Sequence, residues 1–136
     1  MTRLLLDTSA YSAFMSGYIP VRAPVQEASE LWLSATVLGE LLAGFRKGNR
    51  TRENELRLRD FLAEPRVYFA LIDGETAERY AVIHDHLRRA GTPVPVNDVW
   101  IAAAAFQRGL KLLTLDEHFR RIPQVHVVDV SSLPGL

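Results

Sequence analysis

The chain lacks cysteine altogether, so neither disulfides nor thiolate metal sites can form. The absence of cysteine is typical of proteins in a reducing compartment and predicts a cytoplasmic location. No apolar run approaches the ~18 residues of a membrane-spanning helix, which predicts that the protein has no membrane partner. There is also no repeat, low-complexity segment or linker, and the 136 residues predict a single domain, 1–136, with its own core.

Neither sign of charge prevails, since 16 basic and 16 acidic side chains give a net charge of zero. This balance argues weakly against a nucleic-acid partner. The basic side chains are nevertheless concentrated between residues 46 and 59, where six stand against two acidic ones, a local net charge of +4. We interpret the first part of this run as a candidate RNA-binding patch, with the residues Arg46, Lys47, Arg50 and Arg52. A solvated helix face explains the same run equally well.

Short apolar runs alternate with stretches of helical periodicity along the whole chain. Strands are predicted at 3–7, 31–35, 67–72, 110–115 and 125–130, and helices at 8–17, 37–47, 52–64, 75–90 and 98–108. The segment 18–30, which contains two prolines, is predicted to be a loop with a short helix. Side chains that can accept a bond from a free amide of the first turn are expected to cap these helices: Thr8 or Ser9, Thr36, Asp73 and Asn97. The alternation predicts an α/β fold with a mostly parallel sheet covered on both faces.

The predicted helix 98–108 is apolar on nearly every side and includes four consecutive alanines. A helix of this kind is normally buried. Gly109 is expected to end it, and the strand that follows stops at Asp116. Two carboxylates, Asp98 and Asp116, are therefore placed at the ends of buried elements.

Four carboxylates are predicted to converge at one edge of the sheet. Asp7 and Asp116 follow strands, and in open α/β sheets the functional crevice lies outside the carboxyl ends of the strands. Asp98 begins a helix on that same side, and Glu40 lies at the edge of the apolar arc of its own helix. Four such charges without an internal lysine or arginine would repel one another. A divalent cation relieves this, and oxygen ligands suit Mg²⁺ or Mn²⁺ better than zinc.

Four short motifs in this order carry a family resemblance. They are Asp7-Thr8-Ser9 after a strand, Glu40-Leu41-Leu42-Ala43-Gly44, Asp98-Val99-Trp100-Ile101-Ala102-Ala103, and Thr114-Leu115-Asp116-Glu117-His118-Phe119. Together they resemble the PIN-domain ribonucleases and, within them, the VapC-type toxins of VapBC toxin–antitoxin pairs. The resemblance covers nearly the whole chain, although each motif alone is short.

The resemblance implies a three-layer α/β/α sandwich and a metal-binding catalytic quartet of Asp7, Glu40, Asp98 and Asp116. Thr8, Ser9 and Thr114 would be the hydroxyls that support this quartet. The implied activity is that of a metal-dependent endoribonuclease that acts as the toxin of a type II pair. A VapB-like antitoxin that blocks the acidic site, and a homodimer, are the implied partners. A bound cation would activate water, and hydrolysis without a 2′-hydroxyl nucleophile would leave a 5′-phosphate.

Several other functions are compatible with parts of the sequence. A receiver domain also has an acidic Mg²⁺ pocket, but it needs a partner lysine, and lysine occurs only at positions 47 and 111. A non-toxin PIN nuclease of RNA processing and a catalytically inert PIN-fold binding module stay open as alternatives. Taken alone, Asp98 is explained as a helix cap. His84 and His86 lie on diverging sides of a helix and form a poor metal pair.

Overall fold

A computed structural model of the protein describes residues 1–131; residues 132–136, which the single-domain prediction includes, lie outside the described residues. The described elements are β1 (Arg3–Leu6), α1 (Thr8–Met15), α2 (Ile19–Glu27), β2 (Glu30–Ser34), α3 (Ala35–Lys47), α4 (Thr51–Leu62), β3 (Val67–Ala70), α5 (Gly74–Ala90), α6 (Val96–Arg108), β4 (Lys111–Thr114), the 3₁₀ helix η1 (Glu117–Arg121) and β5 (Val127–Asp129). Within residues 1–131, no helix is both long and apolar enough to span a bilayer.

All five strands lie in one parallel sheet with the order β3-β2-β1-β4-β5. The central strand β1 pairs with β2 on one side and with β4 on the other, so Leu5 lies between Trp32 and Leu112. The leucines of β1 are fully buried, as expected for a strand that is covered on both faces. The α/β prediction with a mostly parallel sheet is therefore confirmed.

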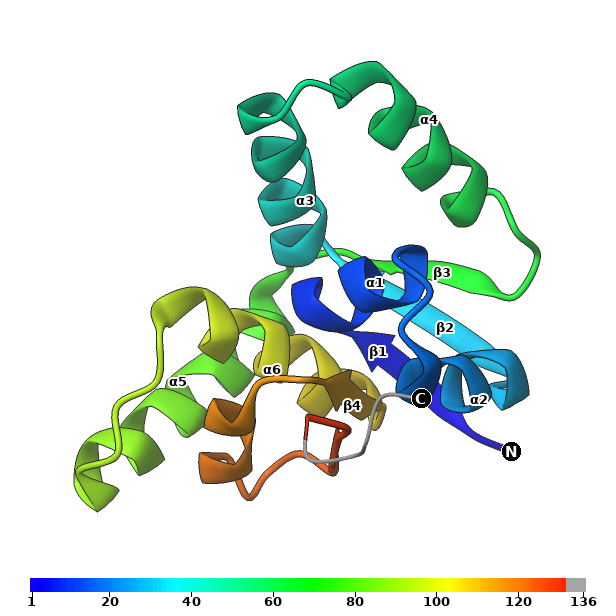
Figure 1. Cartoon of the computed structure of the whole chain (residues 1–136). Helices are drawn as coiled ribbons and strands as arrows, with labels where there is room; N and C mark the ends of the chain where they lie inside the picture. The colour runs from blue at the N-terminus through cyan, green and yellow to red at the C-terminus, as the bar shows by residue number, and fades with distance from the viewer. Residues whose placement is uncertain (132–136) are drawn as a thin grey trace.

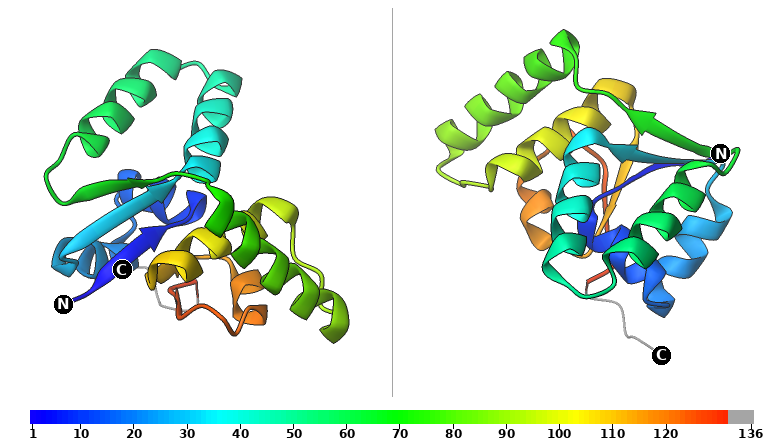
Figure 2. Two further views of the ribbon diagram at one scale, coloured as in Figure 1. Left: turned by 180° about the vertical axis from the view of Figure 1, so that it is seen from behind. Right: turned by 90° about the horizontal axis from the view of Figure 1, so that it is seen from above.

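Helices cover both faces of the sheet. Parallel strands are connected by right-handed crossovers, so the chain direction from β1 to β3 places α1 to α4 on one face. The crossover from β3 back to β4 then places α5 and α6 on the other, which gives three layers (Figures 1 and 2). The helices α3 and α4 form a hairpin that projects away from the sheet (Figure 1).

Helix α6 is buried along the sheet, as its composition predicts. Ala102, Ala103, Ala104 and Ala105 are at most 1% exposed, and their small side chains allow the helix to lie close to the strands. The helix ends at Gly109, whose φ of 64° is left-handed and favours glycine. Burial of α6 therefore sets the position of its N-terminal turn, which contains Asp98.

Most of the predicted helix caps are wrong, and Asp73 is the one that is confirmed, with a capping box to Thr76. Asp7, not Thr8 or Ser9, caps α1. Ser34, not Thr36, caps α3. In both cases the helix begins directly after the strand, so a residue at the strand end accepts the bond of the first turn.

Helix α6 begins earlier than predicted. Its N-cap residue is Pro95, and Asn97 lies inside the first turn instead of capping it. Pro95 has a φ of −52° and a ψ of 143°, and no side-chain hydrogen bond caps the first turn. Asn97 is thereby free to contact another residue through its side chain.

The short helix expected within 18–30 is α2, and η1 is an element that the sequence did not indicate.

Candidate functional site

The predicted carboxylates lie together at the carboxyl end of the parallel strands. Asp7 directly follows β1, and Asp116 lies two residues after β4. Asp98 is in the first turn of α6, and Glu40 is on α3. Burial raises the pKa of Asp98 most, and the negative charges of Asp116, Glu40 and Asp7 raise it further, so the four groups lie close enough to interact electrostatically.

Asp7 is the most enclosed of the four, with 4% of its surface exposed. One carboxylate oxygen accepts from the Ser9 hydroxyl at 2.7 Å and from the Ala10 amide at 2.8 Å, and the other accepts from the Thr114 hydroxyl at 2.5 Å. Burial raises the pKa of Asp7 above its ordinary value, even though these three hydrogen bonds act to lower it. The hydroxyls thus hold a buried carboxylate in one orientation.

Thr114 also positions the acidic residue that follows it. Its hydroxyl oxygen accepts from the Asp116 amide at 2.8 Å. Asp116 in turn caps η1, because one of its carboxylate oxygens accepts from the His118 amide at 2.9 Å. Ser9 and Thr114 therefore connect α1, β4 and the start of η1 around Asp7, whereas Thr8 contacts a different carboxylate.

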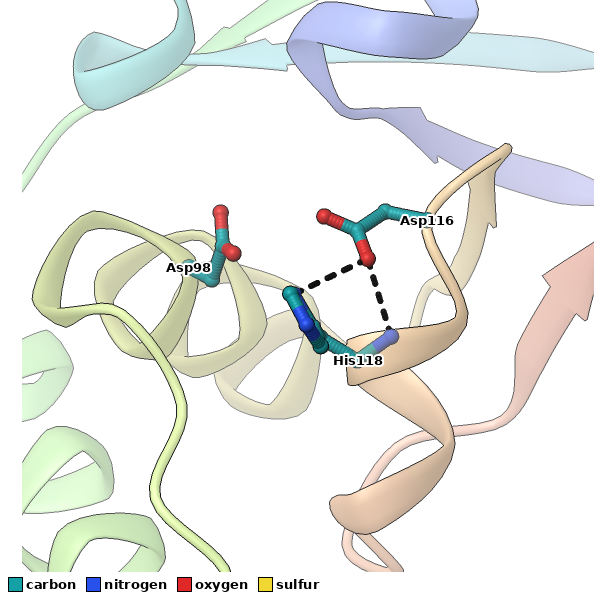
Figure 3. A group of neighbouring side chains, drawn as sticks. All are labelled: Asp98, Asp116 and His118. Carbon is teal, nitrogen blue, oxygen red and sulfur yellow. Dashed lines mark hydrogen bonds and ion pairs between the residues drawn. The ribbon is translucent and has the colours of Figure 1, made fainter.

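Asp98, Asp116 and His118 form a close group of potential metal ligands. Each offers one oxygen or nitrogen, and these atoms all lie within 4.8 Å of one another. Their side chains converge on a common space (Figure 3). The pKa of Asp98 is raised to about 6, mainly by partial burial and then by the charge of Asp116. Two carboxylates at this separation disfavour double ionisation unless a cation lies between them.

Glu40 is not part of this close group. Its carboxylate accepts from the Thr8 hydroxyl at 2.6 Å and from the Asn97 side-chain amide at 3.3 Å. Glu40 therefore links α1 to the start of α6, beside the cluster. The Glu40 carboxylate thus lies close enough to interact electrostatically with Asp98, but its hydrogen bonds come from two neutral donors.

Sequence reasoning missed His118 and Asn97 as members of this site. The signal for His118 is its position two residues after Asp116, within the motif Thr114-Leu115-Asp116-Glu117-His118-Phe119. The spacing alone does not show that η1 directs the imidazole toward Asp98, which the structure reveals (Figure 3). The sequence predicts that Asn97 caps a helix, whereas its side chain donates to Glu40, which is 57 residues away in sequence.

The chemistry of the donors fits a divalent cation. Carboxylate oxygens are the preferred ligands of Mg²⁺ and Mn²⁺. Within the described part of the chain, no lysine or arginine forms an ion pair with Asp7, Glu40, Asp98 or Asp116. The negative charge of the cluster is therefore left for an external cation to neutralise. Asp98 and Asp116 would hold such an ion, with His118 beside them.

The basic residues of the candidate RNA-binding patch lie beyond the site along α3. Arg46 and Lys47 are in the last turn of α3, Arg50 precedes α4, and Arg52 is in its first turn. All four are exposed. Lys47 is seven positions after Glu40, which corresponds to about 10 Å along the helix. The patch is thus within reach of a strand whose scissile phosphate lies at the carboxylates, and its role stays a prediction.

Comparison with known proteins agrees with this architecture. A family model described as the PIN domain matches residues 4–125. Ribonuclease VapC4 of Mycobacterium tuberculosis is 31% identical over 129 residues, which cover 94% of this chain and 97% of that protein. Ribonuclease VapC of Rickettsia bellii is also 31% identical, over 93% of this chain and 96% of that protein.

Solved structures show the same fold. A crystal structure of DNA-bound VapBC from Salmonella typhimurium superimposes with a TM-score of 0.81 at 28% identity and covers 95% of this chain and 98% of that one. The sequence identity, the near-complete coverage of both compared proteins and the shared fold all support the same family assignment. The chain belongs to the PIN-domain family and, within it, to the VapC ribonucleases.

Proposed function

We propose that the protein is a metal-dependent endoribonuclease that acts as the toxin of a VapBC-type pair and hydrolyses RNA phosphodiester bonds. The convergence of Asp98 and Asp116 within 4.8 Å, together with His118, carries this proposal. Among the described residues, the crowded carboxylates have no lysine or arginine partner, and such a cluster suits a divalent cation. The names of the full-length relatives support the choice of RNA as substrate.

Each residue of the site has a task that follows from its contacts. A bound Mg²⁺ or Mn²⁺ would supply positive charge for a phosphodiester oxygen and lower the pKa of a coordinated water. Asp98 or Asp116 would accept a proton from that water and orient the water oxygen toward the phosphorus. Asp7, held by Ser9 and Thr114, would add fixed negative charge behind them. Glu40 would keep α1 and α6 at the spacing that the cluster needs.

Metal removal tests the proposal directly. The purified chain should cleave RNA in Mg²⁺ or Mn²⁺, lose cleavage in excess EDTA and recover it when either metal is restored, because the carboxylates alone cannot activate water. The products should carry 5′-phosphates, which a phosphatase-sensitive end label detects. Full cleavage in EDTA, or 2′,3′-cyclic phosphate ends, would contradict a metal-hydrolytic site.

The two alternatives make different predictions at the same site. An inert PIN-fold binding module would bind RNA without cleaving it, although the four carboxylates that catalysis needs are all present. A non-toxin nuclease of RNA processing would cleave RNA but would not arrest growth when produced in a cell. A toxin would do both, from a cytoplasmic location where it meets its RNA substrate.

An antitoxin is the second partner that we propose, alongside a homodimer whose mass in solution can be measured. A peptide that carries arginine would suit the acidic site, since guanidinium binds carboxylates bidentately and replaces the charge of a metal. The cognate antitoxin should therefore release bound Mn²⁺ from the protein, detectable as the free-ion resonance signal. An antitoxin that inhibits cleavage while Mn²⁺ stays bound would place its contact elsewhere.

A further inference from the structure

We propose that His118 is a direct ligand of the cation, so that the site binds metal through one imidazole nitrogen as well as the oxygens of Asp98 and Asp116. This inference rests on the proposed function and assigns a residue outside the predicted quartet. Its consequence is a site that distinguishes Mn²⁺ from Mg²⁺.

The distances allow three shared ligands. Two atoms that bind one cation at about 2.1 Å each can lie at most roughly 4.2 Å apart. Adjacent ligands of an octahedral cation lie only about 3.0 Å apart, and the potential ligand atoms of Asp98, Asp116 and His118 lie within 4.8 Å of one another, so each pair needs to approach by at most about 1.8 Å. Side-chain rotation supplies a movement of that size without a change of backbone. By contrast, Glu40 lies outside this group and already accepts two hydrogen bonds.

The imidazole is held in a position that faces the carboxylates. The amide of His118 donates to Asp116 at 2.9 Å, which closes the first turn of η1 and directs the ring toward α6. Figure 3 shows the ring below and between the Asp98 and Asp116 carboxylates. The backbone turn at the start of η1 therefore determines where the imidazole of His118 lies.

The Nδ1 atom of His118 is buried and has no hydrogen-bond partner among the described residues, although 43% of the side chain is exposed. The Asp116 oxygen is only 3.1 Å away, but it does not meet the geometry of a hydrogen bond from the ring. A buried nitrogen that lies beside a carboxylate oxygen without a hydrogen bond to it is costly, and a ligand would relieve this cost. A cation between this nitrogen and the carboxylate oxygens would satisfy all three groups.

A nitrogen ligand changes which ion is preferred. Mg²⁺ favours oxygen ligands and retains its waters, whereas imidazole nitrogen binds transition metals more readily. With His118 in the coordination sphere, the protein should bind Mn²⁺ more tightly than Mg²⁺. Without His118, the two carboxylates offer only oxygen ligands, which both Mg²⁺ and Mn²⁺ accept, so the site would distinguish the two ions less.

The test is pulsed electron resonance of Mn²⁺ added to the full chain. The wild type should show the modulation of a directly coordinated imidazole nitrogen, and His118→Ala should lose that signal and at least about tenfold in Mn²⁺ affinity, with a smaller loss for Mg²⁺. His118→Asp should restore Mn²⁺ affinity through oxygen while the nitrogen signal stays absent. The exposed His126→Ala is the matched control and should keep both.

The outcomes separate this inference from the function on which it rests. If Mn²⁺ binds the wild type, requires Asp98 and shows no nitrogen modulation, His118 only pairs with Asp116, and the ligand assignment is overturned while the metal site remains. If Mn²⁺ binding survives Asp98→Asn, or the wild type binds none, both the site and the ligand assignment are wrong.

Discussion

Asp98→Asn should lower the rate of RNA cleavage at least about a hundredfold while the folded structure is retained. The substitution removes one of the two carboxylates of the Asp98, Asp116 and His118 group, together with its negative charge. Asparagine has nearly the same shape, and Asp98 does not cap α6, so the expected loss is specific to chemistry. The measurement is the cleavage rate in saturating Mg²⁺, with the circular dichroism spectrum as the check of folding.

Asp85→Asn is the matched control for charge removal. Asp85 lies on α5, where it forms exposed ion pairs with Arg88 and Arg89, and its loss should leave cleavage within about twofold. Production of the wild-type chain in a cell should arrest growth, and the Asp98→Asn chain should not. Arrest of equal strength by both would remove catalysis from the explanation of toxicity.

Asp98→Asn should also melt at a higher temperature than the wild type in EDTA, and at a lower temperature in excess Mg²⁺. Without metal, the substitution relieves the cost of burying a charged group and the repulsion from Asp116, Glu40 and Asp7, which in this order raise the pKa of Asp98 to about 6. With metal, ligand at about 100 times its Kd adds roughly 2.7 kcal/mol to the free energy of unfolding. For a domain of this size that corresponds to a Tm increase of roughly 10 °C. The variant, which lacks one ligand, should gain much less.

The same comparison has a defined pH dependence in EDTA. The folded pKa of Asp98, about 6, lies above its ordinary value of 3.8, so the native state binds the proton more tightly than the unfolded chain. The stabilisation from this proton is complete below about pH 4 and is lost as the pH rises through 6. The advantage of Asp98→Asn should therefore grow over this interval to about 1–2 kcal/mol, after allowance for solvent screening of a half-buried group.

Thermal melts of both proteins at pH 4, 6 and 8 provide the measurement. A constant difference across this range would mean that Asp98 ionises as it does in water. If the variant melts lower in EDTA at pH 8 and gains equally from Mg²⁺, Asp98 is a structural residue of the first turn of α6 and not a ligand.

The order of the elements and the positions of Asp7, Asp98 and Asp116 could be predicted from sequence for a simple reason. Apolar runs of the length of a strand, ended by an aspartate or begun after Gly109, indicate the local secondary structure. Parallel strands then bring their carboxyl ends to one edge of the sheet. The buried alanines of α6 likewise follow from composition alone. These features depend on residues that are close in the chain.

The remaining features depend on contacts between distant segments, which only the tertiary structure decides. Hydrophobic periodicity places Glu40 at the edge of a helix face, but its donors, Thr8 and Asn97, belong to α1 and α6 and were brought there by packing. The direction of His118 depends on a 3₁₀ turn that Asp116 closes, and such short turns have no periodic pattern. The sequence by itself thus determined which groups bear the charge, whereas the packing of α6 and η1 against the strand ends decided which of them share one point in space.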